Sequence, residues 1–288
     1  MVETRGRRVV VRDASGDRVC FLSGERAVVG DRVRWVEVRG SGGKLVGVEP
    51  RDTVLERVDS TGRVQVLAAN LGGLLVVTAP SAPPFRAGLL DRYIVAARHA
   101  GLDVAVCLNK VDLGVPDEVV AELALRDEVP VLQVSASTGE GLDALALKLA
   151  EWSAERPWAL TGHSGVGKTS LVAALLPEQD DVGEIGALSE HWGTGQHTTT
   201  RSRRFELTGG GSIVDSPGIR TFAPGGLTSA AVRQFFPGLG QVRCHYRDCR
   251  HRPDEEGCAA SEAVPAALLA SYRRMHAELV AIEERQRP

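Results

Sequence analysis

The chain has 288 residues, of which 43% are hydrophobic and 25% charged, and its formal net charge at pH 7 is −3. This length predicts two or three domains, and the composition is ordinary for a soluble protein. The longest weakly polar run, residues 68–85, is broken by three prolines and two glycines, and the chain start shows no export signal. We therefore expect a cytoplasmic, monomeric protein without membrane contacts.

Residues 1–65 are predicted to form a small β-barrel. Short valine-rich runs at 7–13, 18–22, 32–38 and 44–49 are separated by turns rich in glycine, serine and aspartate. The segment is mildly basic, with 13 Lys and Arg against 10 Asp and Glu. These features favour an oligonucleotide-binding barrel, although an SH3-like barrel would give much the same pattern.

From residue 66 to residue 225 the pattern changes to strands that alternate with helices, which is typical of a parallel α/β sheet covered on both faces. Strands are expected at 74–78, 104–108, 129–134, 158–161 and 212–215. Helices are expected at 87–100, 116–126 and 141–153.

A phosphate-binding loop is predicted after the strand at 158–161. Gly162 to Thr169 fits the pattern Gly-x4-Gly-Lys-Thr, and an apolar helix start follows. Lys168 is expected to reach the β- and γ-phosphates, and Thr169 to bind Mg²⁺ through its hydroxyl. The predicted nucleotide-binding residues of this loop are Gly162, His163, Ser164, Gly165, Val166, Gly167, Lys168, Thr169 and Ser170.

Two further motifs end neighbouring strands, at the sheet edge where ligands bind. In Asn109-Lys110-Val111-Asp112, the Asp112 carboxylate can accept the two N–H groups of guanine, which adenine does not match. Asn109 and Lys110 are expected to brace the base and the phosphate loop. Ser135-Ala136 follows the next strand, where a backbone N–H can donate to guanine O6. The three motifs together predict GTP or GDP as the ligand.

The strand at 212–215 ends in Asp-x-x-Gly, a signature of a nucleotide-sensing loop. Asp215 is expected to hold Mg²⁺ through water, and Gly218 to donate its backbone N–H to the γ-phosphate. A threonine of the run 198–200 should close over the magnesium when GTP binds. Thr199 is the central candidate, although the sequence leaves open which of the three threonines does so.

Hydrolysis is predicted to proceed by in-line attack of water on the γ-phosphate, with Lys168, Thr169 and Asp215 in the catalytic site. No glutamine follows the Asp-x-x-Gly motif, so slow intrinsic hydrolysis is expected. His197 is a candidate for positioning the water, and a surface contact with a partner is the alternative role.

Residues 226–288 are predicted to form a zinc domain that ends in a helix after residue 261. Its ligands would be Cys244, Cys249, His251 and Cys258, the three-sulfur, one-nitrogen set of a closed tetrahedral site. His245 is a possible alternative ligand. Nearby arginines could face phosphates, namely Arg243, Arg247, Arg250 and Arg252.

The base-reading motifs precede the phosphate loop, whereas in a Ras-like GTPase they follow it. This order predicts a circularly permuted Ras-like G domain. With residues 69–70, 90–93 and 195–200 and the Cys/His spacing in the same order, the chain resembles the ribosome small-subunit-dependent GTPase A family. The resemblance implies an N-terminal oligonucleotide-binding barrel, the permuted G domain and a C-terminal zinc domain. It also implies GTP hydrolysis that is stimulated by the small ribosomal subunit and its rRNA during late subunit maturation.

Three other functions remain open from the sequence. The chain could be a GTP-gated RNA-binding module in which hydrolysis is incidental, and subunit-dependent hydrolysis would distinguish this from the enzyme. It could be a P-loop ATPase or nucleotide kinase, which Asp112 opposes. It could also be a permuted GTPase that acts on the large subunit, which the barrel and the zinc tail oppose.

Overall fold

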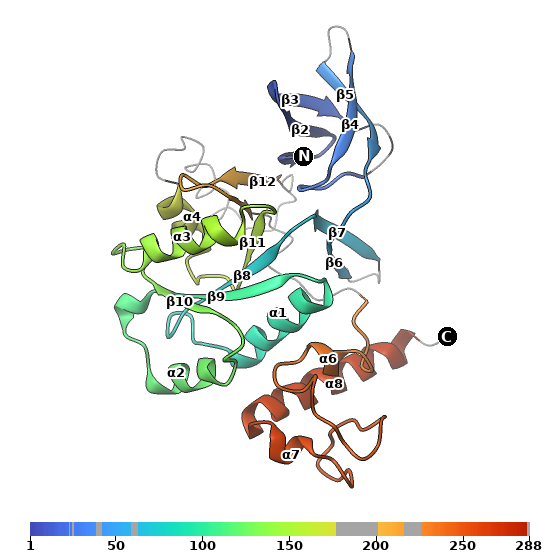
Figure 1. The fold of residues 1–288 in the computed structure, drawn as a ribbon, viewed down its shortest axis with the longest axis vertical. Coiled ribbons are helices and arrows are strands. Elements are labelled where there is room, and N and C mark those ends of the chain that lie inside the picture. Colours follow the sequence, from blue (N-terminus) through green and yellow to red (C-terminus); the bar gives the residue numbers. More distant parts are fainter. Residues whose placement is uncertain are drawn as a thin grey trace.

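The computed structural model describes residues 1–22, 24, 26–38, 42–58, 63–176, 201–215 and 226–286. Figure 1 shows a barrel-like N-terminal part, a central α/β part and a helical C-terminal part. Within the described residues, eleven strands form one mixed sheet in the order β10-β9-β8-β11-β13-β12-β1-β2-β3-β5-β4. No helix in the described part of the chain is long and apolar enough to cross a membrane.

The N-terminal strands alternate between buried and exposed residues. They are β1 (Glu3–Arg5), β2 (Arg8–Asp13), β3 (Gly16–Phe21), β4 (Val33–Val38) and β5 (Gly42–Val48). The inner face buries Val9, Val11, Cys20 and Leu45. Strands β3 and β5 pair in parallel, and the other neighbouring pairs are antiparallel. A separate hairpin, β6 (Val54–Val58) and β7 (Val64–Ala69), leads to the central part.

Five parallel strands form one end of the eleven-stranded sheet, in the order β10-β9-β8-β11-β13. They are β8 (Gly73–Thr78), β9 (Asp103–Asn109), β10 (Val131–Val134), β11 (Trp158–Thr161) and β13 (Ser212–Asp215). All five lie within two residues of the predicted strands. The continuous apolar character of β8 and β11 reflects burial on both faces, because helices cover each side.

Two clusters of buried side chains pack on opposite faces of this sheet. Leu74 and Val76 of β8 face one cluster, with helices α1 (Ala87–His99) and α2 (Asp117–Ala124). Leu75 and Val77 face the other, with α3 (Leu142–Trp152) and α4 (Lys168–Leu175). The alternation along one strand therefore separates the two layers of helices.

A strand that the sequence did not indicate joins the N-terminal strands β1–β5 to the parallel strands of the central part. Strand β12 (Arg201–Glu206) pairs antiparallel with β13 on one side and with β1 on the other. Side chains reinforce the junction, since Arg203 lies 3.9 Å from Glu3 and Arg12 lies 3.2 Å from Glu206. The N-terminal strands are thus paired with the strand that directly follows the predicted threonine switch.

The C-terminal part packs a helical core against α1, as Figure 1 shows. It contains α6 (Val232–Phe235), α7 (Ala260–Ala263) and α8 (Ala266–Gln286), and α8 confirms the helix predicted after residue 261. Phe236 and Tyr272 meet edge to face with ring centroids 5.5 Å apart. Val95 of α1 belongs to the same cluster, so this core is shared with the central part.

Ser153, at the C-terminal end of α3, ties this helix to the start of β13. Its hydroxyl donates to Leu149 O (2.5 Å) and accepts the N–H of Ser212 (2.9 Å), and both serines are buried. Ser153→Ala is expected to lower the free energy of unfolding by about 2 kcal/mol, because a buried N–H loses its acceptor. Urea-induced unfolding would measure this loss. Exposed Ser81→Ala is the control, and equal stability of the two variants would contradict the prediction.

Candidate functional site

The phosphate loop lies between β11 and α4, in the context that the sequence predicted. Gly162 has φ +140°, and a Cβ there would collide with the carbonyl oxygen of Val77 on the neighbouring strand β8. Gly167 has φ +89°, and a Cβ there would collide with the side-chain amide of Asn109. Both positions therefore require glycine to keep the loop close to β8 and β9.

Lys168 begins α4 and is buried within the curve of the loop. Its Nζ donates to the carbonyl oxygens of Gly162 (2.7 Å) and His163 (2.6 Å). Its ammonium group therefore sits where the backbone turns, at the N-terminus of α4, whose partial positive charge attracts anions. Thr169 follows in the first turn of the helix and is half-buried.

Asn109 and Lys110, at the end of β9, both contact the phosphate loop. The Asn109 amide nitrogen donates to Val166 O (2.9 Å), and its oxygen accepts the N–H of Ala136 (3.0 Å). Lys110 has a left-handed backbone, with φ +68°. Its Nζ donates to Gly165 O and to Ala82 O, each at 2.7 Å. Asn109 thus links all three motifs that the sequence placed at one sheet edge.

Asp112 lies on an exposed single turn of 3-10 helix, η1 (Val111–Leu113). Its Oδ1 accepts a hydrogen bond of 2.5 Å from the hydroxyl of Ser135, which is fully buried. The same hydroxyl accepts the N–H of Thr138 (3.2 Å) and lies 2.9 Å from Ser137 Oγ. The carboxylate is therefore oriented from one side by a rigid serine, and its other oxygen faces away from that contact.

Asp215 ends β13 at the same edge as the phosphate loop. Strand β13 pairs in parallel with β11, so Asp215 and the loop both follow the carboxyl ends of adjacent strands. Asp215 is half-buried. The predicted residues His197, Thr198, Thr199, Thr200 and Gly218 lie outside the described residues.

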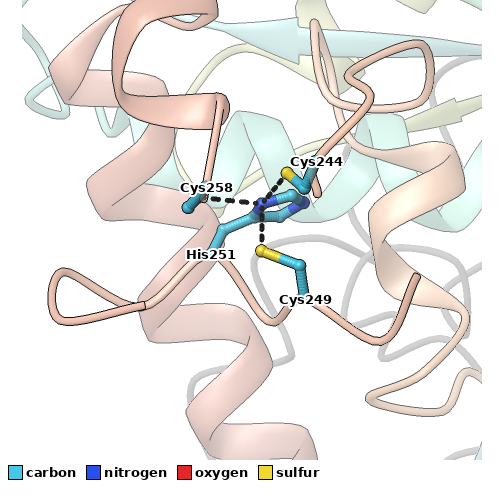
Figure 2. A group of neighbouring side chains, drawn as sticks. All are labelled: Cys244, Cys249, His251 and Cys258. Carbon is cyan, nitrogen blue, oxygen red and sulfur yellow. Dashed lines mark hydrogen bonds between the residues drawn. The ribbon is translucent and has the colours of Figure 1, made fainter. Parts of the chain in front are cut away.

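Cys244, Cys249, His251 and Cys258 converge in the C-terminal part, and Figure 2 shows the three cysteine side chains around the His251 ring. Their ligand atoms all lie within 4.8 Å of one another. His251 Nδ1 lies 3.5, 3.4 and 3.4 Å from the sulfurs of Cys244, Cys249 and Cys258. A tetrahedron with Zn–S of about 2.3 Å and Zn–N of about 2.0 Å has N···S edges of roughly 3.5 Å, so the four donors fit zinc.

His245, the alternative ligand, lies outside this group. Its ring instead meets Tyr246 edge to face, with centroids 4.6 Å apart. Burial raises the pKa of Cys249 to about 12 and lowers the pKa of His251. Without a metal both ligands are therefore uncharged at pH 7, and zinc binding would displace thiol protons.

Two residues that the sequence analysis missed hold the His251 turn. Glu255 accepts the backbone N–H groups of Arg250 (2.9 and 3.0 Å) and Arg252 (3.0 Å), on either side of His251. Arg273 Nε donates to His251 O at 2.6 Å. These bonds stabilise a left-handed backbone at His251, with φ +59°, which is uncommon for a residue other than glycine. No ligand spacing marks such residues in a sequence.

Glu255→Ala is expected to weaken zinc binding by about tenfold, because the turn that carries His251 loses three hydrogen bonds. Competition with a chelator of known affinity would measure the change. Glu256→Ala is the matched control, since Glu256 is exposed and has no side-chain partner in the described structure. Equal zinc affinity of the two variants would show that Glu255 does not support the ligands.

Comparisons with known proteins place this site in context. A family model described as RsgA GTPase matches residues 48–224. The small ribosomal subunit biogenesis GTPase RsgA of Azotobacter vinelandii is 42% identical over 265 residues, which are 88% of this chain and 75% of that protein. YjeQ from Thermotoga maritima has a similar crystal structure, with a TM-score of 0.76, 24% identity and coverage of 97% of this chain and 96% of that one. The crystal structure of YloQ, described as a circularly permuted GTPase, has a TM-score of 0.69, 19% identity and coverage of 100% and 97%. These two similarities establish the fold.

Proposed function

Since the chain belongs to the RsgA GTPase family, we propose that it hydrolyses GTP to GDP and phosphate during biogenesis of the small ribosomal subunit. The observation that carries the proposal is the 42% identity to a named biogenesis GTPase across 88% of this chain. The linked motifs of the phosphate loop, Asn109 and Ser135 support it, because they form one continuous site.

Guanine recognition is assigned to Asp112, with the Ser135-Ala136 turn alongside it. The carboxylate would accept the N1 and N2 protons of the base, while Ser135 holds Oδ1 in place. The Ala136 N–H already donates to Asn109, so the O6 contact would need a backbone donor of the same turn. Val111 completes the Asn-Lys-Val-Asp motif. Residues 162–170 would surround the phosphates, and hydrogen bonds from Asn109 and Lys110 brace this loop.

Lys168 would stabilise the charge that develops on the β- and γ-phosphate oxygens. Its Nζ donates hydrogen bonds to two loop carbonyl oxygens, which hold the ammonium group at the positive, N-terminal end of α4. Thr169 and Asp215 are the described residues that would hold Mg²⁺, and this ion neutralises phosphate charge when bound. Water then attacks the γ-phosphorus in line, and the bond to the β–γ bridging oxygen breaks to release GDP.

The motifs of this chain lack a residue known to orient the attacking water, and this supports activation by the ribosome. Isoleucine and arginine follow Asp-x-x-Gly, so no glutamine is available there to orient the water. His197, and a threonine such as Thr199, remain candidates for completing the site, and Gly218 for contacting the γ-phosphate. We infer that the small subunit supplies or orders the missing groups, and that unstimulated hydrolysis is slow.

We propose that the chain has three domains with separate roles, at residues 1–65, 66–225 and 226–288. The strand order and the single parallel pair support an oligonucleotide-binding barrel. The Cys244, Cys249, His251 and Cys258 cluster would hold one structural zinc. Both outer parts would contact rRNA, and the protein would act as a monomer in the cytoplasm, where small subunits are assembled.

Steady-state GTP hydrolysis, measured alone and with purified small or large ribosomal subunits, tests the proposal. We expect stimulation of at least about 100-fold by small subunits, the lower end of what one positioned general acid or base contributes. Large subunits should leave the rate unchanged. Tight GTP binding without stimulation by either subunit would contradict the proposal and favour a GTP-gated RNA-binding module.

A further inference from the structure

The motif Leu-Asp-Arg-Tyr at residues 90–93 of α1 takes no part in the GTP contacts proposed so far. Its last three residues contact three different parts of the molecule: the segment after α2 through Arg126, α8 through Glu278, and β11 through Thr161. The tyrosine contact is the one that reaches the nucleotide site. Thr161 ends β11 and directly precedes Gly162, the first residue of the phosphate loop.

A buried ion pair fixes α1 against the segment that follows α2. Asp91 Oδ1 lies 2.7 Å from Arg126 Nε, and the two side chains are 0% and 2% exposed. Arg126 also donates to the backbone carbonyl of Glu122. Such a pair tolerates little displacement, because an unpaired charge inside a protein is costly. It therefore helps to set the orientation of α1, from which Tyr93 extends to β11.

Tyr93 and Thr161 meet in the protein interior. The two residues are 4% and 0% exposed, and their side chains form a hydrogen bond with each other. Burial raises the pKa of Tyr93 above its usual value, so the hydroxyl stays protonated and neutral at pH 7. Loss of a partner would be costly for a polar group at this depth, so the bond holds both side chains in place.

A small cavity lies between α1 and the phosphate loop, next to this hydrogen bond. Leu90 and Tyr93 line it from the helix, and His163 and Val166 line it from the loop. Side-chain packing between the helix and the loop is therefore incomplete there, although protein interiors are otherwise close-packed. The bond to Thr161 consequently provides a fixed point between α1 and the start of the loop.

This fixed point lies beside the groups that hold Lys168. The Lys168 Nζ donates to the carbonyl oxygens of Gly162 (2.7 Å) and His163 (2.6 Å), which are the two residues after Thr161. A displacement of Thr161 would therefore move the carbonyls that hold the ammonium group. Groups that bind a ligand keep their geometry only when the residues that support them are themselves fixed.

We propose that Tyr93 is a positioning residue for nucleotide binding. Its hydroxyl acts through Thr161 and the first carbonyls of the phosphate loop, and these hold Lys168 where the phosphates of GTP bind. The proposal rests on the proposed function, because it takes GTP as the ligand of the loop.

The affinity of full-chain variants for GTP, measured by competition with a fluorescent GTP analogue, tests this role. Tyr93→Phe keeps the ring and removes the hydroxyl, and Thr161→Val replaces the hydroxyl by a methyl group. Each is expected to weaken GTP binding by about fivefold, the effect of one lost hydrogen bond. The double variant should also lose about fivefold, because both changes remove the same bond. Thr161→Ser keeps a hydroxyl and should bind GTP as the unchanged chain does.

Tyr272→Phe is the matched control. Tyr272 is also a buried tyrosine, 1% exposed, but it lies in the C-terminal core, so its variant should bind GTP normally. A contact that served stability alone would lower the free energy of unfolding without changing nucleotide affinity. Unchanged GTP affinity in Tyr93→Phe would therefore overturn the proposal. Losses that multiply to about 25-fold in the double variant would overturn it too, since the two residues would then act separately.

Inosine triphosphate separates the phosphate loop from base recognition, because inosine lacks the N2 amine that Asp112 would bind. The ratio of GTP affinity to inosine triphosphate affinity should be the same in Tyr93→Phe and in the unchanged chain. A smaller ratio would place the effect at the base and overturn the role in the loop. The proposed function fails separately, if small subunits do not stimulate hydrolysis by the unchanged chain, whatever the affinities of these variants are.

Discussion

Asp112→Asn is expected to lower the affinity for GTP by about 100- to 1,000-fold. Two hydrogen bonds from guanine to a charged acceptor are lost, at about 1.5–3 kcal/mol each before partial compensation. Ser135 determines which atom of the new asparagine faces the base. Its hydroxyl donates to Oδ1 and would keep the asparagine oxygen on the side of Ser135. The amide nitrogen then points its protons at the N–H groups of the base. Isothermal titration calorimetry with GTP would measure the loss.

The same variant should gain affinity for xanthosine triphosphate. Xanthine carries an oxygen where guanine carries the N2 amine, so it can accept a proton from the asparagine amide. We expect a gain of about tenfold, the contribution of one hydrogen bond made to a matched partner. Asp127→Asn is the control, because Asp127 is exposed and has no side-chain partner in the described structure. Unchanged GTP affinity in Asp112→Asn would remove this residue from base recognition.

The central sheet and its site could be predicted because two strong constraints act on those residues. Strands buried on both faces, such as β8, must be apolar throughout, and β8 begins at Gly73 where the sequence predicted a start at residue 74. A loop that surrounds phosphate needs glycine where the backbone approaches a neighbouring strand, as at Gly162. These requirements act on residues that are close together in the chain, so they can be recognised in the sequence.

The missed strands depend on partners that lie far away in the chain. Strand β12 reads Arg-Ser-Arg-Arg-Phe-Glu, with Phe205 as its one large apolar residue, and it forms because β1 and β13 pair with its two edges. Strand β1 has three residues and depends on the same pairing. The hairpin of β6 and β7 lay across the predicted boundary at residue 65. Whether such segments form strands depends more on pairing with distant strands than on their intrinsic β-propensity.

The functional site also contains residues that the sequence indicated and residues that it did not. Motif spacing predicted residues for contact with nucleotide and zinc, and these assignments remain predictions. It also predicted that Asn109 and Lys110 reach the phosphate loop, and their hydrogen bonds confirm this. It could not identify Glu255 or Arg273, because they act on backbone groups of the ligand turn rather than on the ligand. Any acidic or basic residue at a suitable distance could do this, so the sequence pattern carries no signal.

Removal of zinc is expected to have the largest effect on folding. Helices α6 and α7 have four residues each, and the partly buried Cys244 and Cys258 pack against the core around Phe236 and Tyr272. The proposed zinc would therefore tie together loops that have little regular structure of their own. Structural zinc contributes about 10–16 kcal/mol in small zinc domains, more than this short core could replace.

Cys249→Ala should accordingly lose its one bound zinc per chain and most protection of residues 226–286 from amide hydrogen exchange. Protection of α1 should fall as well, because Val95 packs in the same core. Cys20→Ala is the control, since Cys20 is buried among the N-terminal strands and this variant should retain full zinc content. If Cys249→Ala kept the protection of residues 226–286 after losing zinc, helix packing alone would hold this part, and the metal would serve only the local turn at His251.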